Sequence, residues 1–217
     1  SYFKGRPSGE GKLEDYTSVA WGMLELYQVT FDVSYLEKAC ALMQTAYDHF
    51  WDAEYGGFFA YADDGEPLIA RLKETYDGAM PSPNSVASFV LNKLSMLCAS
   101  PFWTQLAEKQ NSFLAAQAVQ QPVGYGFWLY GLFCILAGNS QIIAVSPSGQ
   151  DLQKLRKMLV KNAGLCVLVK NGENQNALGQ LAEYTKEYST AEGTKFYQCA
   201  DHQCHTPLHE LPNEMLR

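Results

Sequence analysis

The sequence lacks any long apolar run: none reaches the roughly 18 residues that a membrane-spanning helix needs. Residues 1–7 also lack the apolar segment of a signal peptide. Positive charge is scarce as well, because 16 Lys and Arg stand against 23 Asp and Glu, giving a formal net charge of −7. Nucleic-acid and anionic-membrane surfaces need concentrated Lys and Arg. We therefore expect no nucleic-acid partner, no membrane partner and a cytoplasmic location.

The sequence also lacks the composition that is typical of a disordered chain. Charged residues make up only 18% of the 217 residues, whereas hydrophobic residues make up 47%. Aromatic residues reach 13%, with 13 Tyr, 11 Phe and 4 Trp. A chain of this length and composition can bury a substantial core. The many rings suit either that core or a wall that faces a sugar.

Five helices are expected in the first part of the chain. Apolar residues recur at three- and four-residue spacing over 13–30 and again over 35–50, and the short link between them predicts an antiparallel hairpin. Proline-containing starts predict a third helix after 81–85, a fourth over 101–118 and a fifth from Pro122 to about residue 137. Between the second and third helices, Gly56 and Gly57 precede aromatic residues and a turn, which predicts a small β excursion.

The pattern changes after residue 140. Branched runs at 142–145 and 165–169 flank an amphipathic stretch at 150–162, which predicts a βαβ unit. Residues 171–192 are polar and are predicted to be the least ordered, and 195–199 form a candidate last strand. We therefore predict a mainly α fold, with a helical arc at 1–140 and a small α/β segment at 141–217.

Four cysteines, Cys40, Cys98, Cys134 and Cys166, lie in apolar stretches. They are most simply interpreted as buried thiols in a reduced cytosolic protein. No cofactor motif accompanies them, and we expect no cofactor.

The other two cysteines lie in a polar tail. Cys199 and Cys204 stand beside His202 and His205, and thiolate and imidazole are ligands that zinc prefers. The spacing is not that of a standard zinc finger. A metal site, a disulfide or redox pair, and two unbonded thiols all remain open, and unbonded thiols are the interpretation we favour.

Two short motifs contain acids at expected helix starts. Leu13-Glu14-Asp15-Tyr16 places an acid where it either stabilises the helix dipole or points into a cleft. Residues 76–85, YDGAMPSPNS, place Asp77, Ser82 and Asn84 in a stiff segment that enters a helix, where they either cap it or face a ligand.

Taken together, these stretches resemble the YyaL and spermatogenesis-associated protein family. The matching pieces are LEDY at 13–16, FWDAEYGGFF at 50–59, YDGAMPSPNS at 76–85, IIAV at 142–145 and YQCADHQCHTP at 197–207. Members of that family are similar to a thioredoxin-like domain fused to an α/α toroid related to N-acylglucosamine 2-epimerase and the six-hairpin glycosidases. The chain departs from the expected pattern at Pro83, where relatives are expected to carry Gly.

The resemblance implies that the chain is the C-terminal part of a larger protein, with an arc of a toroid at 13–137. An incomplete arc exposes an apolar edge, so we expect self-association or cover from a missing N-terminal portion. A carbohydrate ligand is the implied partner.

The resemblance also implies a site at one end of the arc. Asp15 and Asp77 are its candidate catalytic pair, since glycoside hydrolysis and epimerisation both use two proton-transferring groups. The candidate substrate-binding residues share aromatic or hydrogen-bonding side chains near the helix ends: Tyr16, Trp51, Tyr55, Phe58, Tyr76, Ser82 and Asn84.

The reaction itself is left open. Related epimerases rely on His, and the single His of the helical arc, His49, is more simply interpreted as structural. Three functions remain: an enzyme or former enzyme on carbohydrate, which we favour, a scaffold for a thioredoxin-like redox protein, and a non-catalytic interaction module.

Overall fold

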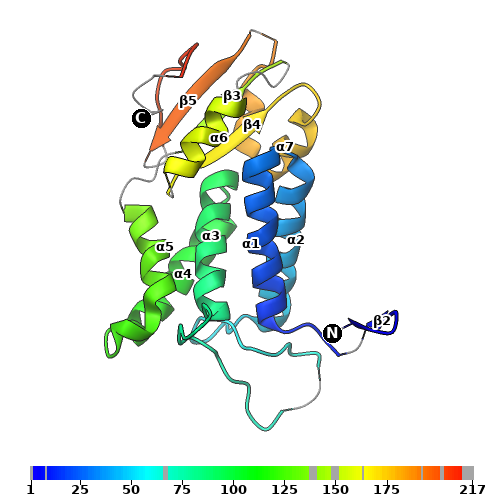
Figure 1. Cartoon of the computed structure of the whole chain (residues 1–217), viewed down its shortest axis with the longest axis vertical. Coiled ribbons are helices and arrows are strands. Elements are labelled where there is room, and N and C mark those ends of the chain that lie inside the picture. The colour runs from blue at the N-terminus through cyan, green and yellow to red at the C-terminus, as the bar shows by residue number, and fades with distance from the viewer. Residues whose placement is uncertain are drawn as a thin grey trace.

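The protein is described here by a computed structural model that covers residues 2–7, 9–65, 68–136, 141–147, 152–162, 164–191, 193–200 and 203–211. The helices of residues 13–136 form the lower part of the molecule in Figure 1, and a small sheet lies across their upper ends. No helix in these described ranges is both long and apolar enough to cross a membrane.

The first two helices form the predicted hairpin. Helix α1 spans Leu13–Thr30 and α2 spans Val33–Phe50. The turn between them is short because Phe31 adopts a left-handed conformation, with φ of 60°. The Asp32 carboxylate then accepts a hydrogen bond from the Ser34 N–H at 3.0 Å and caps α2.

A second hairpin follows with the same design. Helix α3 spans Pro83–Cys98 and α4 spans Pro101–Ala118. Each begins with proline in its first turn, where the missing N–H costs no helical hydrogen bond. Ala99 closes α3 in a left-handed conformation, with φ of 47°. The predicted bounds of α4 are confirmed, and α3 begins within the proline-containing stretch 81–85 that was predicted to start it.

A short 3-10 turn, η1 at Pro122–Tyr125, leads into α5 at Gly126–Leu136. Helix α1 packs against α2 and α3, and α3 packs against α4 and α5. The N-terminal ends of α1, α3 and α5 all lie at the lower end in Figure 1, so these three helices form one layer with a common direction. Helices α2 and α4 run the opposite way.

The C-terminal part forms a mixed sheet. Its strands are β3 at Gln141–Val145, β4 at Cys166–Lys170, β5 at Lys195–Ala200 and β6 at Gln203–Cys204, in the order β4-β3-β5-β6. β3 and β4 are parallel, as the βαβ prediction requires, and α6 at Leu152–Lys161 connects them. A hairpin of two short strands precedes the helices: β1 at Tyr2–Phe3 and β2 at Arg6–Pro7, each of two residues.

The two faces of β3 pack against different partners. Ile143 and Val145 belong to the same core cluster as the helices, whereas Ile142 and Ala144 pack with α6. Both faces are thus covered, which explains why this strand is a continuous branched run in the sequence. The helical core continues without a break into the sheet. The proposed domain boundary at 140 stays a prediction.

One prediction about the C-terminal part is wrong. Residues 171–192 were expected to be the least ordered, yet they contain α7 at Gln175–Leu181 and the 3-10 turn η2 at Glu183–Glu187. Leu178 and Ala182 are fully buried in the main core, and α7 contacts α2. Tertiary burial of these two apolar residues therefore outweighs the polar composition of this segment.

Candidate functional site

The lower end of the helix layer contains the residues that the sequence singled out. Asp15 lies in the first turn of α1, where its carboxylate accepts a hydrogen bond from the Lys12 N–H at 2.9 Å. Asp15 is exposed. This is the helix-capping geometry that the sequence left open beside a catalytic role. The catalytic assignment of Asp15 stays a prediction.

Asp77 joins the starts of two helices of the same layer. One carboxylate oxygen accepts the Ser82 N–H at 2.8 Å, at the start of α3. The other accepts the N–H groups of Phe127 at 2.9 Å and Trp128 at 3.2 Å, in the first turn of α5. A carboxylate between two helix N-termini is electrostatically favourable. Both oxygens are thus engaged by backbone donors, and the catalytic role of Asp77 also stays a prediction.

The Asn84 side chain is fully buried, and its polar atoms form hydrogen bonds within the protein rather than facing solvent. Its side chain accepts the Phe58 N–H at 2.8 Å and donates to the Phe58 carbonyl at 2.9 Å. It also donates to the Glu74 carbonyl at 2.8 Å. Ser82 caps α3 through the Ser85 N–H at 3.2 Å. These contacts fasten the long connection between α2 and α3 to the helix layer.

The candidate aromatic residues divide by exposure. Phe58 is fully buried and stacks edge-on against Trp51, with ring centroids 4.9 Å apart. Tyr16 packs against Phe50 at 5.3 Å. Tyr55 and Tyr76 are 72% and 60% exposed. Of this set, Tyr55 and Tyr76 are the side chains that present most of their surface to a ligand.

A cation could be held at the end of α2. His49 Nδ1 lies 3.2 Å from an Asp63 oxygen and 3.5 Å from an Asp64 oxygen. These three residues are the candidate metal-ligating group found among the residues that the structure describes. The Arg71 guanidinium donates to the His49 carbonyl at 3.0 Å and brings a positive charge beside the group.

A second candidate site, which the sequence did not reveal, lies on the face of α1, α3 and α5. Trp21 of α1 stands 5.6 Å from Phe89 of α3 and 5.1 Å from Phe127 of α5, measured between ring centroids. Phe89 and Tyr130 stack at 6.4 Å. Three helices that are distant in sequence thus contribute to one row of rings.

A polar pair adjoins these rings. Lys93 Nζ lies 2.6 Å from a Glu25 carboxylate oxygen, and Trp21 Nε1 donates to the same oxygen at 3.1 Å. Lys93 also lies over the Phe89 ring, 4.9 Å from its centroid. The Lys93 side chain is 14% exposed, whereas that of Glu25 is 50% exposed. Glu25 therefore presents a carboxylate to solvent beside an aromatic surface.

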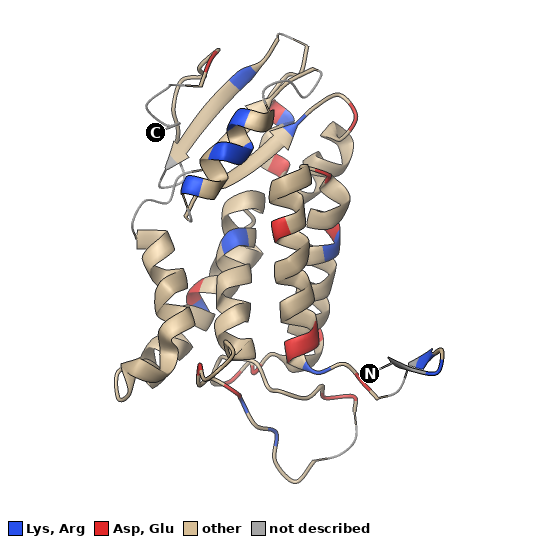
Figure 2. Ribbon diagram, viewed as in Figure 1, with Lys and Arg blue, Asp and Glu red and all other residues tan. Residues whose placement is uncertain are grey.

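Helix α6 covers one end of this surface and makes it a groove. Trp21, Phe89, Lys93 and Tyr130 line the groove from the helix layer, and Leu159 and Val160 line it from α6. The two walls are joined where Arg156 Nε donates to the Val29 carbonyl at 2.5 Å. Figure 2 shows Lys and Arg gathered on α6, whereas α5 carries no charge.

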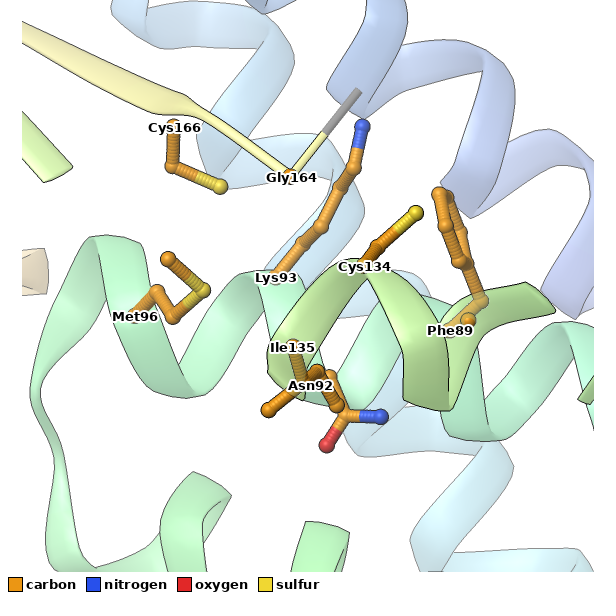
Figure 3. Close-up of a pocket in the computed structure, with 9 residues that line it drawn as sticks. Phe89, Asn92, Lys93, Met96, Cys134, Ile135, Gly164 and Cys166 are labelled. Carbon is orange, nitrogen blue, oxygen red and sulfur yellow. The ribbon is translucent and has the colours of Figure 1, made fainter. Parts of the chain in front are cut away.

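A smaller, mostly apolar cavity of about 20 Å³ lies beside the groove, between α3, α5 and the start of β4. Phe89, Met96, Cys134 and Cys166 contribute to its wall, and in Figure 3 Lys93 extends past Gly164. Burial raises the pKa of the Cys166 thiol to about 11, so this thiol is protonated at neutral pH. The cavity offers apolar packing rather than a reactive centre.

The C-terminal cysteines are bonded to each other. Cys199 of β5 and Cys204 of β6 form a disulfide between paired positions of the two strands. The favoured interpretation as unbonded thiols is therefore wrong, and the disulfide alternative is the one the structure contains. Two bonded sulfurs are not thiolate ligands, and His205 is exposed. His202 lies outside the described residues.

Comparison with known proteins identifies relatives of the chain. No protein-family model matches it. Spermatogenesis-associated protein 20 of mouse is 42% identical over 94 residues, which are 43% of this chain, and the human protein is 40% identical over the same length. Over these 94 residues the chain is homologous to spermatogenesis-associated protein 20. An uncharacterised protein of Caenorhabditis elegans is 23% identical over 202 residues, 90% of this chain.

The resemblance found in the sequence motifs is thus confirmed. The match covers 12% of the mouse and human spermatogenesis-associated protein 20 and 27% of the nematode protein. What those longer proteins do as a whole is therefore not transferred to this chain by similarity.

Proposed function

We propose that α1 to α5 form one arc of an α/α toroid and that the groove on this arc binds a carbohydrate. The arrangement of the helices supports the toroid. Alternate helices α1, α3 and α5 pack side by side in a common direction, and α2 and α4 return on the other side (Figure 1). Repeated helical hairpins with one continuous inner layer are what such an arc requires.

The observation that carries the ligand class is the row of rings next to a carboxylate. Trp21 and Tyr130 present aromatic surface along the groove, beside the buried ring of Phe89, and the Glu25 carboxylate lies within 3.1 Å of the Trp21 indole nitrogen. The apolar C–H faces of a sugar stack on aromatic rings, and its hydroxyl groups donate hydrogen bonds to carboxylates. The groove combines both kinds of contact.

The ligand has two candidate positions. One is the groove itself. The other is the lower end of the helix layer, where Asp15 and Asp77 are the proposed catalytic pair and Tyr55 and Tyr76 are exposed. The contacts of the two acids are those of helix caps, so the groove is the position that we favour.

Saturation-transfer NMR of the full chain against a panel of neutral mono- and disaccharides tests the proposal. Binding that is lost in Trp21→Ala and weakened in Glu25→Gln, but kept in the exposed control Tyr55→Ala, places the sugar in the groove. Loss in Asp15→Asn and Asp77→Asn with an unchanged Trp21→Ala places it at the helix ends. No binding by the wild-type chain rejects the carbohydrate function in favour of an interaction module.

We also propose that the chain self-associates through α5. This helix has no charged residue, and Phe133 and Leu136 are 65% and 75% exposed on it. Exposed apolar side chains of this kind mark an interaction surface. Sedimentation at increasing concentration should show a species heavier than the 24.2 kDa monomer, and Phe133→Lys should abolish it. A wild-type monomer at every concentration rejects the proposal.

The disulfide favours one second candidate, a scaffold for a redox protein. Cys199 and Cys204 form a pair that could exchange with another dithiol. Intact mass with and without reductant, followed by incubation with a reduced thioredoxin, tests this function. Reduction of the pair by thioredoxin supports the role, and a disulfide that resists reduction in the folded chain excludes it.

A further inference from the structure

Two free thiols meet between the helical hairpins. Cys40 lies in α2 and Cys98 is the last residue of α3, and their sulfur atoms are 3.9 Å apart. Cys40 is half-buried and Cys98 is buried. The two residues are 58 positions apart in the sequence, so only the packing of one hairpin against the other brings them together.

We propose that Cys40 and Cys98 are an oxidation site that forms a disulfide in response to a peroxide. Bond formation has to shorten the sulfur–sulfur separation from 3.9 Å to about 2.05 Å. The product covalently joins α2 of the first hairpin to α3 of the second. It therefore locks together the two hairpins that carry Trp21 and Phe89, whether or not the groove binds a sugar.

The different exposure of the two thiols sets the order of the reaction. The neighbouring Cys40 thiol and burial raise the pKa of Cys98 well above its usual value, which keeps Cys98 protonated at neutral pH. Cys40 is the more exposed thiol, so it meets the oxidant first. Its thiolate attacks one peroxide oxygen, the O–O bond breaks, and hydroxide leaves to give a sulfenic acid.

The second step closes the bond. The Cys98 sulfur attacks the Cys40 sulfur, the S–O bond breaks, and the Cys98 proton leaves with the hydroxide as water. Two thiols are thereby oxidised while one hydrogen peroxide is reduced to two waters, so no other oxidant is needed.

The test is peroxide treatment of the full chain, followed by alkylation and tryptic mapping without reductant. The chain should lose the mass of two hydrogen atoms, and peptide 39–71 should be found joined to peptide 94–109. Tryptic cleavage separates this product from the other thiols, because Cys134 lies in 110–154, Cys166 in 162–170, and Cys199 with Cys204 in 196–217.

Single cysteine substitutions identify the two residues that form the link. Cys40→Ala and Cys98→Ala should each abolish the linked peptide, whereas the matched controls Cys134→Ala and Cys166→Ala should keep it. The oxidised wild type should melt about 5–10 °C higher than the reduced form, and reductant should reverse the shift. Peptides that stay unlinked, a sulfinic acid on Cys40, or dimers linked through Cys40 would each overturn the proposal, and the peptide map shows these outcomes without relying on any variant.

Discussion

The Gln28 side chain pairs with the backbone of Val167 as a neighbouring strand would. Its amide nitrogen donates to the Val167 carbonyl at 2.8 Å, and its amide oxygen accepts the Val167 N–H at 2.8 Å. β4 is the edge strand of the sheet, and an unpaired edge exposes backbone groups to non-native pairing. Tyr27 extends this cover by accepting the Val169 N–H at 3.3 Å. Helix α1 thus protects the sheet edge with its side chains.

Gln28→Ala should therefore destabilise the chain. The substitution leaves a buried N–H and a buried carbonyl of Val167 without partners, which costs about 2–4 kcal/mol. Chemical denaturation checks this value. The control Gln44→Ala removes an exposed amide that donates a hydrogen bond to Asp48, and its effect should stay within about 0.5 kcal/mol. Equal effects of the two substitutions would contradict the role of Gln28.

Asn84→Ala should be at least as damaging, because Asn84 is fully buried and bonds Phe58 and Glu74 at once. We expect a loss of about 2–4 kcal/mol, measured by urea unfolding. Asn84→Asp keeps the acceptor for the Phe58 N–H and loses the two donors, so it should also destabilise. A change below about 0.5 kcal/mol for both variants would show that the hydrogen bonds of Asn84 do not stabilise the segment between α2 and α3.

Asp52 should make stability depend on acidic pH. Burial opposes the charged form, but the bond from Lys73 at 2.7 Å and the N–H groups of Glu54 and Tyr55 outweigh it and hold the pKa of Asp52 below its usual value. A lowered folded-state pKa gives stability that is complete above the unfolded pKa of about 3.9 and is lost as the pH falls through the folded value.

The check is the unfolding free energy of wild type and Asp52→Asn between pH 6 and pH 2. The variant should be less stable at pH 6, and the difference should shrink as the pH falls below about 4. A difference between wild type and Asp52→Asn that is constant with pH would contradict the prediction.

Two glycines should respond to alanine with opposite signs. Gly22 lies within α1, and a Cβ there would meet nothing within 4 Å, so Gly22→Ala should stabilise by about 0.5–1 kcal/mol through helix propensity. A Cβ on Gly164 would collide with the Cys134 carbonyl oxygen, a backbone atom that cannot move aside easily. Gly164→Ala should destabilise by more than about 1 kcal/mol. Thermal unfolding of both variants checks the signs.

The helices of this protein could be predicted from the sequence because local signals determine them. The Asp32 cap, the prolines at 83 and 101 and the three- and four-residue spacing of apolar residues act within one or two turns. The strands β3 and β4 were likewise predictable from branched runs, since burial on both faces leaves no polar positions in them. Asp77 and Asn84 were singled out, but their partners were not foreseen.

What only the tertiary structure decided are the contacts between segments that are distant in sequence. The 67 residues between Trp21 and Phe89 hold no signal that their rings meet, and the Glu25–Lys93 pair arises only when α1 packs on α3. The folding of α7 depends on burial of Leu178 against the main core. Sequence by itself thus determined which segments are helices and strands, because caps and periodicity are local. The groove, the paired thiols and the covered sheet edge depend on how those segments pack, which is set by shape and burial over the whole chain.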